Sequence, residues 1–282
     1  MLIKKLWASC LGGLPVPLMR IYRKVTWYRK FERHPFPFKT IQIETQANCN
    51  RDCGYCPVSI LPKRTGRMAD EVIESIIQQL QEINYSQLLH FHFLNEPLLD
   101  KRIFRFLTLA KESLPKARIQ LTTNGDLLDM DVINRLIFEC RVDNIQISLH
   151  DQETDIRFTS LLAVAPDDVT NKVNVKKMYD AKKVNGVSNK KIISWGGSLQ
   201  HREDEYDFRR VPLSGCDKTD LIIDYLGDVH PCCDDALSEY VLGNVHKNTI
   251  LEIWDGSRSQ FKEHFTGNFK KIPCDRCTKI GS

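Results

Sequence analysis

Short apolar runs alternate with amphipathic segments along most of the chain. Strand-like runs occur at 38–45, 88–94, 117–122, 144–149, 174–178 and 191–195. Apolar residues recur at helical spacing at 72–80, 103–110 and 132–138, and Asp70 can cap the first of these helices. This alternation predicts an α/β fold with a mainly parallel sheet, which is either an open barrel or a doubly wound sheet.

Polar residues follow four of these runs at the point where each run ends. Cys49 follows the first run, Asn95 and Glu96 the second, Asn124 the third and His150 the fourth. The carboxyl ends of parallel strands lie at one end of the sheet, where α/β proteins bind their ligands. The pattern therefore predicts one active site with side chains from all four segments.

Two segments fall outside the alternating pattern and divide the chain into three parts. Residues 1–38 carry eight Lys and Arg side chains against one acid, interleaved with apolar and aromatic residues. This composition favours peripheral membrane contact through residues 1–33, or else a helix that packs on the domain or binds a partner. Residues 201–282 hold short strands, turns and paired cysteines, which predicts a small metal-stapled domain after a core of residues 39–200.

The overall composition is that of a globular protein. The 282 residues are 42% apolar and 27% charged, and a net charge of +4 gives no indication of nucleic-acid binding. No run of about twenty apolar residues predicts a membrane-spanning helix. Charged residues after the fourth strand, such as Asp151 and Arg157, are interpreted as solvated side chains rather than substrate contacts.

The positions of the cysteines indicate more about function than the overall composition does, because most of them lie in two groups. The ten are Cys10, Cys49, Cys53, Cys56, Cys140, Cys216, Cys232, Cys233, Cys274 and Cys277. A chain of this length needs no disulfides to hold its core, and grouped cysteines favour metal ligands in a reducing compartment over a disulfide framework. We therefore expect a cytoplasmic metalloprotein.

The first group has the spacing C-x3-C-x2-C, in Cys49, Cys53 and Cys56. Three thiolates on a loop after a strand can converge on a [4Fe–4S] cluster, which usually has four cysteine ligands. With three, one iron is left open to a small ligand. A three-cysteine zinc site is the less favoured alternative, because structural zinc prefers four protein ligands.

This spacing, with the aromatic Tyr55 before the last cysteine, resembles the signature of the radical S-adenosylmethionine (SAM) superfamily. The resemblance implies that the open iron binds SAM and that SAM is cleaved to a 5′-deoxyadenosyl radical, which abstracts hydrogen from a substrate. It also implies SAM contacts at other positions. These are Tyr55, Asn95, Glu96, Thr123, Asn124, Ser148 and His150, with Glu96 accepting from the methionine ammonium.

The second group is Cys216, Cys232, Cys274 and Cys277, a complete ligand set for either a [4Fe–4S] cluster or a zinc knot. Cys216, Gly227, Cys232 and the final C-x2-C resemble the SPASM/twitch appendage of radical SAM enzymes, in its shorter twitch form. The resemblance implies a second [4Fe–4S] cluster. Cys232 and its neighbour Cys233 could exchange roles as ligand, and the spare thiol could donate hydrogen to a substrate radical.

The resemblance implies a partial (β/α)6 TIM-like barrel with a small iron–sulfur domain. Within the group, the runs His90-Phe91-His92-Phe93 and Trp195-Gly196-Gly197-Ser198-Leu199 are similar to dehydrogenases that act on aminocyclitols. We expect an oxidoreductase that oxidises a carbinol of a sugar or aminocyclitol, with a flavodoxin- or ferredoxin-type electron donor. The alternatives are an epimerase that uses Cys233, a peptide-modifying maturase, and a non-catalytic metal-stapled binding protein.

Overall fold

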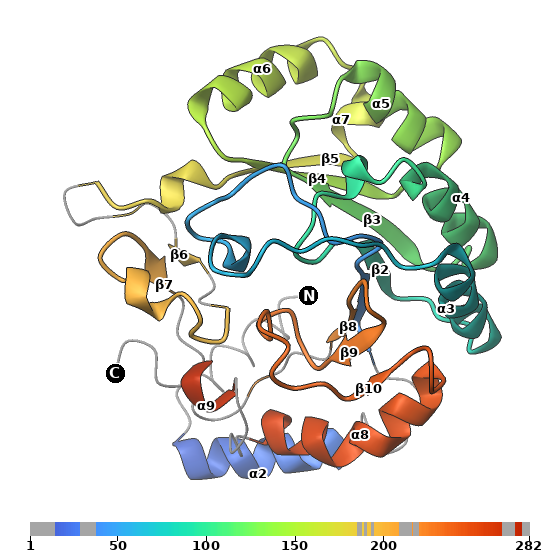
Figure 1. Cartoon of the computed structure of the whole chain (residues 1–282), viewed down its shortest axis with the longest axis vertical. Helices are drawn as coiled ribbons and strands as arrows, with labels where there is room; N and C mark the ends of the chain where they lie inside the picture. The colour runs from blue at the N-terminus through green and yellow to red at the C-terminus, as the bar shows by residue number, and fades with distance from the viewer. Residues whose placement is uncertain are drawn as a thin grey trace.

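A twisted sheet of eight strands forms the centre of the molecule (Figure 1). The computed structural model describes residues 15–28, 38–184, 188, 191–192, 195–208, 216, 220–266 and 274–277. Part of the basic N-terminal segment, including Cys10, lies outside these residues. The strand order is β10-β9-β8-β1-β2-β3-β4-β5. The strands are β1 (Thr40–Ile43), β2 (Leu88–Phe91), β3 (Arg118–Thr123), β4 (Asn144–Leu149), β5 (Val173–Lys177), β8 (Asp220–Ile223), β9 (Asp228–His230) and β10 (Gly243–Asn244).

Helices follow the first four strands and lie along the outside of the curved sheet (Figure 1). They are α3 (Asp70–Glu82), α4 (Ile103–Ser113), α5 (Met130–Asn134) with a π-helical continuation (Arg135–Glu139), α6 (Gln152–Ala163) and α7 (Asp167–Thr170). The remaining α-helices of the described residues are α2 (Val16–Trp27), α8 (Ile250–Phe265) and α9 (Cys274–Cys277). Since β1 to β5 pair in parallel, the expected α/β architecture is confirmed.

The two faces of the sheet differ in character. Side chains such as Ile41, Leu89 and Ile145 are fully buried under the helices, where they form the core. Alternate positions point to the concave face and are polar: Nδ2 of Asn144 donates to Oε1 of Gln120 at 2.9 Å, between strands β4 and β3. A closed barrel usually fills its interior with bulky aliphatic side chains. This open, polar concave face is instead suited to a hydrophilic ligand.

The sixth expected strand lies elsewhere. Lys191–Ile192 forms a two-residue strand, β6, which pairs in parallel with β7 (Asp207–Phe208) in a separate small sheet. The edge of the main sheet beside β1 is instead taken by β8, whose residues pair in parallel with the whole of β1. The C-terminal part of the chain therefore extends the central sheet and is not a detached appendage.

Helix α3 begins one residue earlier than expected, because Asp70 was predicted to be its N-cap residue. Ala69 is the N-cap residue of α3, so Asp70 is the first helical residue. The Asp70 carboxylate is paired with Arg102 and Arg105 of the next helix. An acidic side chain in the first turn also interacts favourably with the helix dipole. Asp70 therefore stabilises the start of α3 through charge interactions and not as its N-cap residue.

Candidate active site at the carboxyl ends of the strands

A cavity of about 360 Å³ opens at the carboxyl ends of the parallel strands. It brings together every residue that the sequence assigns to the first cluster and to SAM: Cys49, Cys53, Cys56, Tyr55, Asn95, Glu96, Thr123, Asn124, Ser148 and His150. These residues come from four loops that are up to about a hundred positions apart in the chain. The strand-end rule explains why they meet.

The three cysteines of the loop after β1 are half-buried and lie close together. Burial, followed by the neighbouring Cys53 and Cys49 sulfurs, raises the pKa of Cys56 to about 12. The same two causes, burial first, raise the pKa of Cys53. Such a group binds as thiolates only when a cation replaces the protons, and bound iron provides that charge. Three convergent thiols therefore fit a cluster with one open iron.

Arg51 fastens this cysteine loop to the loops after β3 and β4. Its guanidinium donates to both carboxylate oxygens of Asp126, at 2.8 and 2.5 Å, and to Asp151 at 2.9 Å. Asp151 also caps α6, because it accepts from the hydroxyl of Thr154 at 2.5 Å and from the backbone N–H of Thr154 at 2.7 Å. These two hydrogen bonds, the hydroxyl first, are the main reason that the pKa of Asp151 falls to about 2. Asp151, interpreted from the sequence as a solvated charge, has a side chain that is 44% exposed and is also ion-paired with Arg51. The residue holds the cluster loop in place through Arg51.

Glu96 lies at the base of the cavity with 1% of its surface exposed. Oε1 accepts from Oγ1 of Thr123 at 2.7 Å and from the backbone of Leu98 at 3.1 Å, and Oε2 accepts from the backbone of Asn124 at 2.7 Å. Burial raises the pKa of Glu96, and these hydrogen bonds oppose that shift. A carboxylate has about four acceptor positions, so one remains for a ligand.

Asn95 stabilises the turn before Glu96. Its Oδ1 atom accepts from the backbone N–H of Phe93 at 3.1 Å. Asn95 is not among the described residues with a positive φ angle, so this loop does not need glycine at that position.

Tyr55 and His150 lie over the cysteine loop. Their rings are stacked with centroids 5.8 Å apart, and the Tyr55 hydroxyl is hydrogen-bonded to Nδ1 of His150. The same nitrogen lies 3.3 Å from Sγ of Cys53. Burial, followed by the charge of Arg51, lowers the pKa of His150 to about 4, so the imidazole is neutral at physiological pH. Ser148 lines the cavity beside Lys176, its partner in the β4–β5 register.

The sequence reasoning did not assign several other cavity residues to the site, among them His92, Lys176, Met178 and Trp195. His92 shares the concave face with His90, and Nδ1 of His92 is buried without a hydrogen-bond partner. Desolvation lowers the pKa of His92 to about 4, so its ring is neutral. The period-two spacing of His90 and His92 places them on one face of the strand, and this signal could have identified the second histidine.

Cys216 lies near Cys274, the first residue of α9. Burial raises the pKa of Cys274 to about 12, and the nearby Cys216 contributes to the same shift. Nε of Arg276, between the two cysteines of α9, donates to the Gly196 carbonyl at 3.0 Å. Across the described residues, no three His, Cys, Asp or Glu side chains are arranged around a single-ion site. A cuboidal cluster does not require its ligands to surround one ion, because each thiolate binds a different iron.

Cys233 is oriented differently from the other C-terminal cysteines. It packs with Cys56 against an apolar cluster that includes Phe93, Leu94 and Ile222. Phe93 and Leu94 line the cavity, whereas Cys233 is not among the described residues that do. Its thiol therefore lies in the wall between the cavity and the C-terminal segment.

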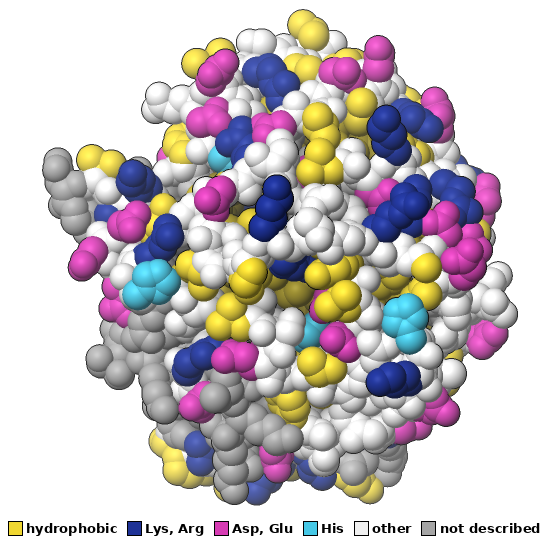
Figure 2. Space-filling model, in the orientation of Figure 1, with side chains coloured by type: hydrophobic (Ala, Val, Ile, Leu, Met, Phe, Trp, Pro, Cys, Tyr) yellow, Lys and Arg dark blue, Asp and Glu magenta, His cyan; other side chains and the backbone are white. Residues whose placement is uncertain are grey.

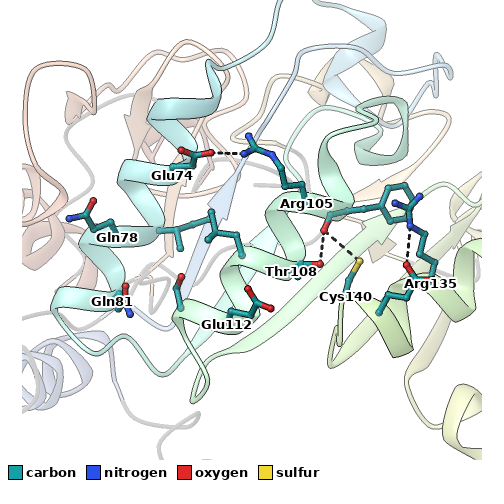
Figure 3. A pocket seen from close by; sticks show the side chains of 13 residues that line it. Glu74, Gln78, Gln81, Arg105, Thr108, Glu112, Arg135 and Cys140 are labelled. Carbon is teal, nitrogen blue, oxygen red and sulfur yellow. Dashed lines mark hydrogen bonds and ion pairs between the residues drawn. The ribbon is translucent and has the colours of Figure 1, made fainter.

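A larger hollow of about 860 Å³ lies on the outer helical surface, between α3, α4 and the π-helical turn (Figure 3). Some of its polar side chains are paired with each other or with the backbone: Arg105 with Glu74 at 2.6 Å, and Thr108 with the carbonyl oxygen of Phe104 at 3.0 Å. Cys140, interpreted as a core residue, is buried at its edge. The hollow shares no lining residue with the cysteine cavity, and we do not consider it the active site.

Within the described part of the chain, no helix is both long and apolar enough to span a membrane.

Comparison with known proteins agrees with this geometry. The family model of the radical SAM superfamily matches residues 43–180, and that of the SPASM iron–sulfur cluster-binding domain matches residues 216–278. The S-adenosyl-L-methionine-dependent 2-deoxy-scyllo-inosamine dehydrogenase of Niallia circulans is 27% identical over 257 residues, which cover 86% of this chain and 94% of the relative.

Solved structures show the same fold. BtrN in complex with AdoMet and 2-DOIA has a TM-score of 0.71 and 25% identity, covering 87% of this chain and 93% of BtrN. Native anSMEcpe with bound AdoMet and the Cp18Cys peptide has a TM-score of 0.54 at 17% identity, covering 86% and 91%. The expected cofactors, SAM and iron–sulfur clusters, are confirmed by the two family matches. The chain belongs to the radical SAM superfamily and is a radical SAM oxidoreductase with a C-terminal SPASM domain.

Proposed function

We propose that this enzyme oxidises a carbinol of an aminocyclitol or a sugar. The main support is the overall similarity to BtrN, a structure solved with AdoMet and 2-DOIA, over 87% of this chain. The cavity is consistent with such a substrate, because polar side chains such as His92, Ser148 and Lys176 line it at the concave face of the sheet. A small polyol offers many hydrogen-bonding groups to a wall of this kind.

The residues around the cavity have complementary roles in this proposal. Cys49, Cys53 and Cys56 would hold the first cluster, which with bound SAM would supply the radical chemistry that removes a hydrogen atom from the carbinol carbon. Glu96 accepts from the SAM ammonium with its remaining acceptor position. The other SAM contacts are Tyr55, Asn95, Thr123, Asn124, Ser148 and His150.

The second cluster has a separate role. Oxidation of an alcohol to a ketone removes two electrons, and abstraction of one hydrogen atom removes only one of them. A [4Fe–4S] cluster on Cys216, Cys232, Cys274 and Cys277 would be the one-electron acceptor for the other. A flavodoxin- or ferredoxin-type protein would reduce the first cluster. The domains in this proposal are residues 1–38, 39–200 and 201–282, with the last completing the sheet edge through β8.

The test uses the full chain with both clusters reconstituted, SAM, dithionite and 2-deoxy-scyllo-inosamine. We expect 5′-deoxyadenosine together with a ketone two mass units lighter than the substrate, as removal of two hydrogens requires. SAM cleavage without ketone formation from this probe or from a panel of sugars and cyclitols would overturn the proposal but leave the family assignment unchanged. Absence of SAM cleavage would instead indicate failed reconstitution, which the iron content would reveal.

Two other reactions remain as outcomes of the same assay. SuiB bound to its precursor peptide SuiA shares the fold at a TM-score of 0.52, so a peptide substrate is the second candidate. Epimerisation with Cys233 as hydrogen donor predicts a product of unchanged mass that carries solvent hydrogen. The position of Cys233 behind Phe93 and Leu94 makes this the less favoured reaction. We place the enzyme in the cytoplasm, where its thiols stay reduced.

A further inference from the structure

Helix α2 has two faces with different surroundings. Its inner face packs on α8, and the two helices lie side by side (Figure 1). Trp27 is 2% exposed, and its ring lies 5.8 Å from that of Phe265. The Arg23 guanidinium lies over the same Phe265 ring at 5.3 Å and donates to its carbonyl oxygen at 3.4 Å. These contacts hold the helix against the enzyme in one orientation.

The opposite face of α2 is apolar and exposed to solvent. Large side chains recur there at spacings of three and four residues: Leu18, Ile21, Tyr22, Val25 and Tyr28, which are 41–59% exposed. They account for five of the fifteen exposed large apolar side chains among the described residues. Isolated exposed apolar residues are ordinary, but a continuous stripe along one helix marks an interaction surface.

Basic side chains border this stripe. Arg20 and Lys24 are four residues apart, so they lie together on one flank of the helix. The described residues 15–28 contain Arg20, Arg23 and Lys24 and no acidic residue. Apolar and basic side chains are visible at the lower edge of the molecule, where α2 lies (Figures 1 and 2).

We propose that this face of α2 binds the surface of an anionic phospholipid bilayer, so that the enzyme is a peripheral membrane protein. The apolar stripe would enter the boundary between headgroups and acyl chains, the two tyrosines would lie at headgroup depth, and Arg20 and Lys24 would contact lipid phosphates. The exposed apolar stripe and the lack of acidic residues within 15–28 favour an anionic bilayer over a groove on another protein. Because α8 already fixes α2, little ordering is needed on binding.

The experiment is vesicle flotation of the full, cluster-loaded chain, with phosphatidylcholine vesicles that contain or lack phosphatidylglycerol. We expect flotation with the anionic vesicles, and weaker flotation at high salt because salt screens the basic side chains. The double variant Ile21→Ser with Val25→Ser should bind at least about tenfold more weakly, since two apolar side chains no longer enter the bilayer. Lys24→Glu should bind more weakly only to the anionic vesicles.

The matched control is Ile156→Ser with Val164→Ser. These side chains are 68% and 83% exposed but lie on and just after α6, outside the stripe, so flotation should be unchanged. Dithionite-driven SAM cleavage without substrate should be equal in all variants, which shows that the fold survives. Equal flotation of wild type and the stripe variant, or no flotation of wild type, would overturn the proposal. If wild type self-associates without binding lipid, and only the stripe variant loses this self-association, the face would instead bind a second copy of the chain.

Discussion

Arg51 and Asp126 form a two-point ion pair that joins the cysteine loop to the loop after β3. Nε and Nη2 of Arg51 each donate to a different oxygen of Asp126. Asn50 donates to the same carboxylate at 2.7 Å, and Asn124 donates to Asn50 at 2.7 Å. The segment that carries the cluster ligands is therefore fastened to the segment that contacts Glu96. Displacement of one segment is expected to move the other.

Asp126→Asn should reduce iron incorporation at the first site. The amide cannot accept both guanidinium hydrogen bonds, and a part-buried Arg51 would be left with only Asp151. Loss of such a charged pair costs about 1–3 kcal/mol in the ordered loop. Iron and sulfide content after reconstitution measures the effect. Glu139→Gln, on the outer helical surface, is the control and should load iron as wild type does; equal loading of both variants would contradict the prediction.

Glu96→Gln should weaken SAM binding while the first cluster is retained. Three donors converge on the carboxylate, and an amide nitrogen in place of one oxygen would oppose at least one of them as well as the SAM ammonium. We expect the Kd for SAM to rise about 10–1000-fold, as for loss of a charged hydrogen bond. The measurement is SAM titration of the cluster-loaded protein, followed by the change in the cluster EPR signal. An unchanged Kd would remove Glu96 from the SAM site.

The buried histidines predict a loss of stability in mild acid. The pKa of His92 falls from 6.5 to about 4 on folding, chiefly through desolvation, so between these values the unfolded chain binds more protons than the folded protein. The free energy of unfolding therefore decreases as pH falls from about 6.5 toward 4, by at most about 1.4 kcal/mol per pH unit for this group.

His92→Asn should flatten this dependence relative to wild type. Urea unfolding of the full chain at several values between pH 7 and pH 5 provides the comparison. Only the difference between the two proteins is informative, because the pKa values of the buried Glu44 and Glu96 are raised and oppose the histidine effect. His201→Asn, at an exposed position, is the matched control for the substitution itself. Parallel curves for wild type and His92→Asn would show that His92 is not desolvated.

Cys232→Ala should remove the second cluster, whereas Cys233→Ala should retain it. In the proposed ligand set, Cys232 binds iron and Cys233 packs into the apolar wall with Phe93 and Leu94. We expect the iron content to fall by about four atoms in Cys232→Ala, as for loss of one [4Fe–4S] cluster, and to stay unchanged in Cys233→Ala. The reverse result would exchange the roles of the two cysteines.

The strand-end rule accounts for what could be predicted from the sequence. Cys49, Glu96, Asn124 and His150 each follow a strand-like run, and parallel pairing is enough to bring them to one cavity. The rule does not give side-chain partners. The ion pair of Asp151 was not predicted because its partner Arg51 is 100 residues away, and nothing in local charge patterning indicates that pair.

Pairing over long separations explains the other differences. Lys176 enters the cavity because it is in register with Ser148, and the register of two strands depends on the whole sheet. The strand that pairs with the outer edge of β1 is β8, which lies about 180 residues further along the chain, and not the strand at Lys191. Period and composition predict that a segment is extended, but they do not choose its neighbour.

The pairing of β8 with β1 also affects how the protein is made. During synthesis the edge of β1 stays open until nearly four fifths of the chain has been made, because its partner begins at Asp220. Contacts between such distant segments form slowly, and an open parallel edge is prone to non-native association in the meantime. The N-terminal and C-terminal parts are therefore unsuited to separate expression or to exchange between relatives. Each needs the other's strand to complete its own sheet.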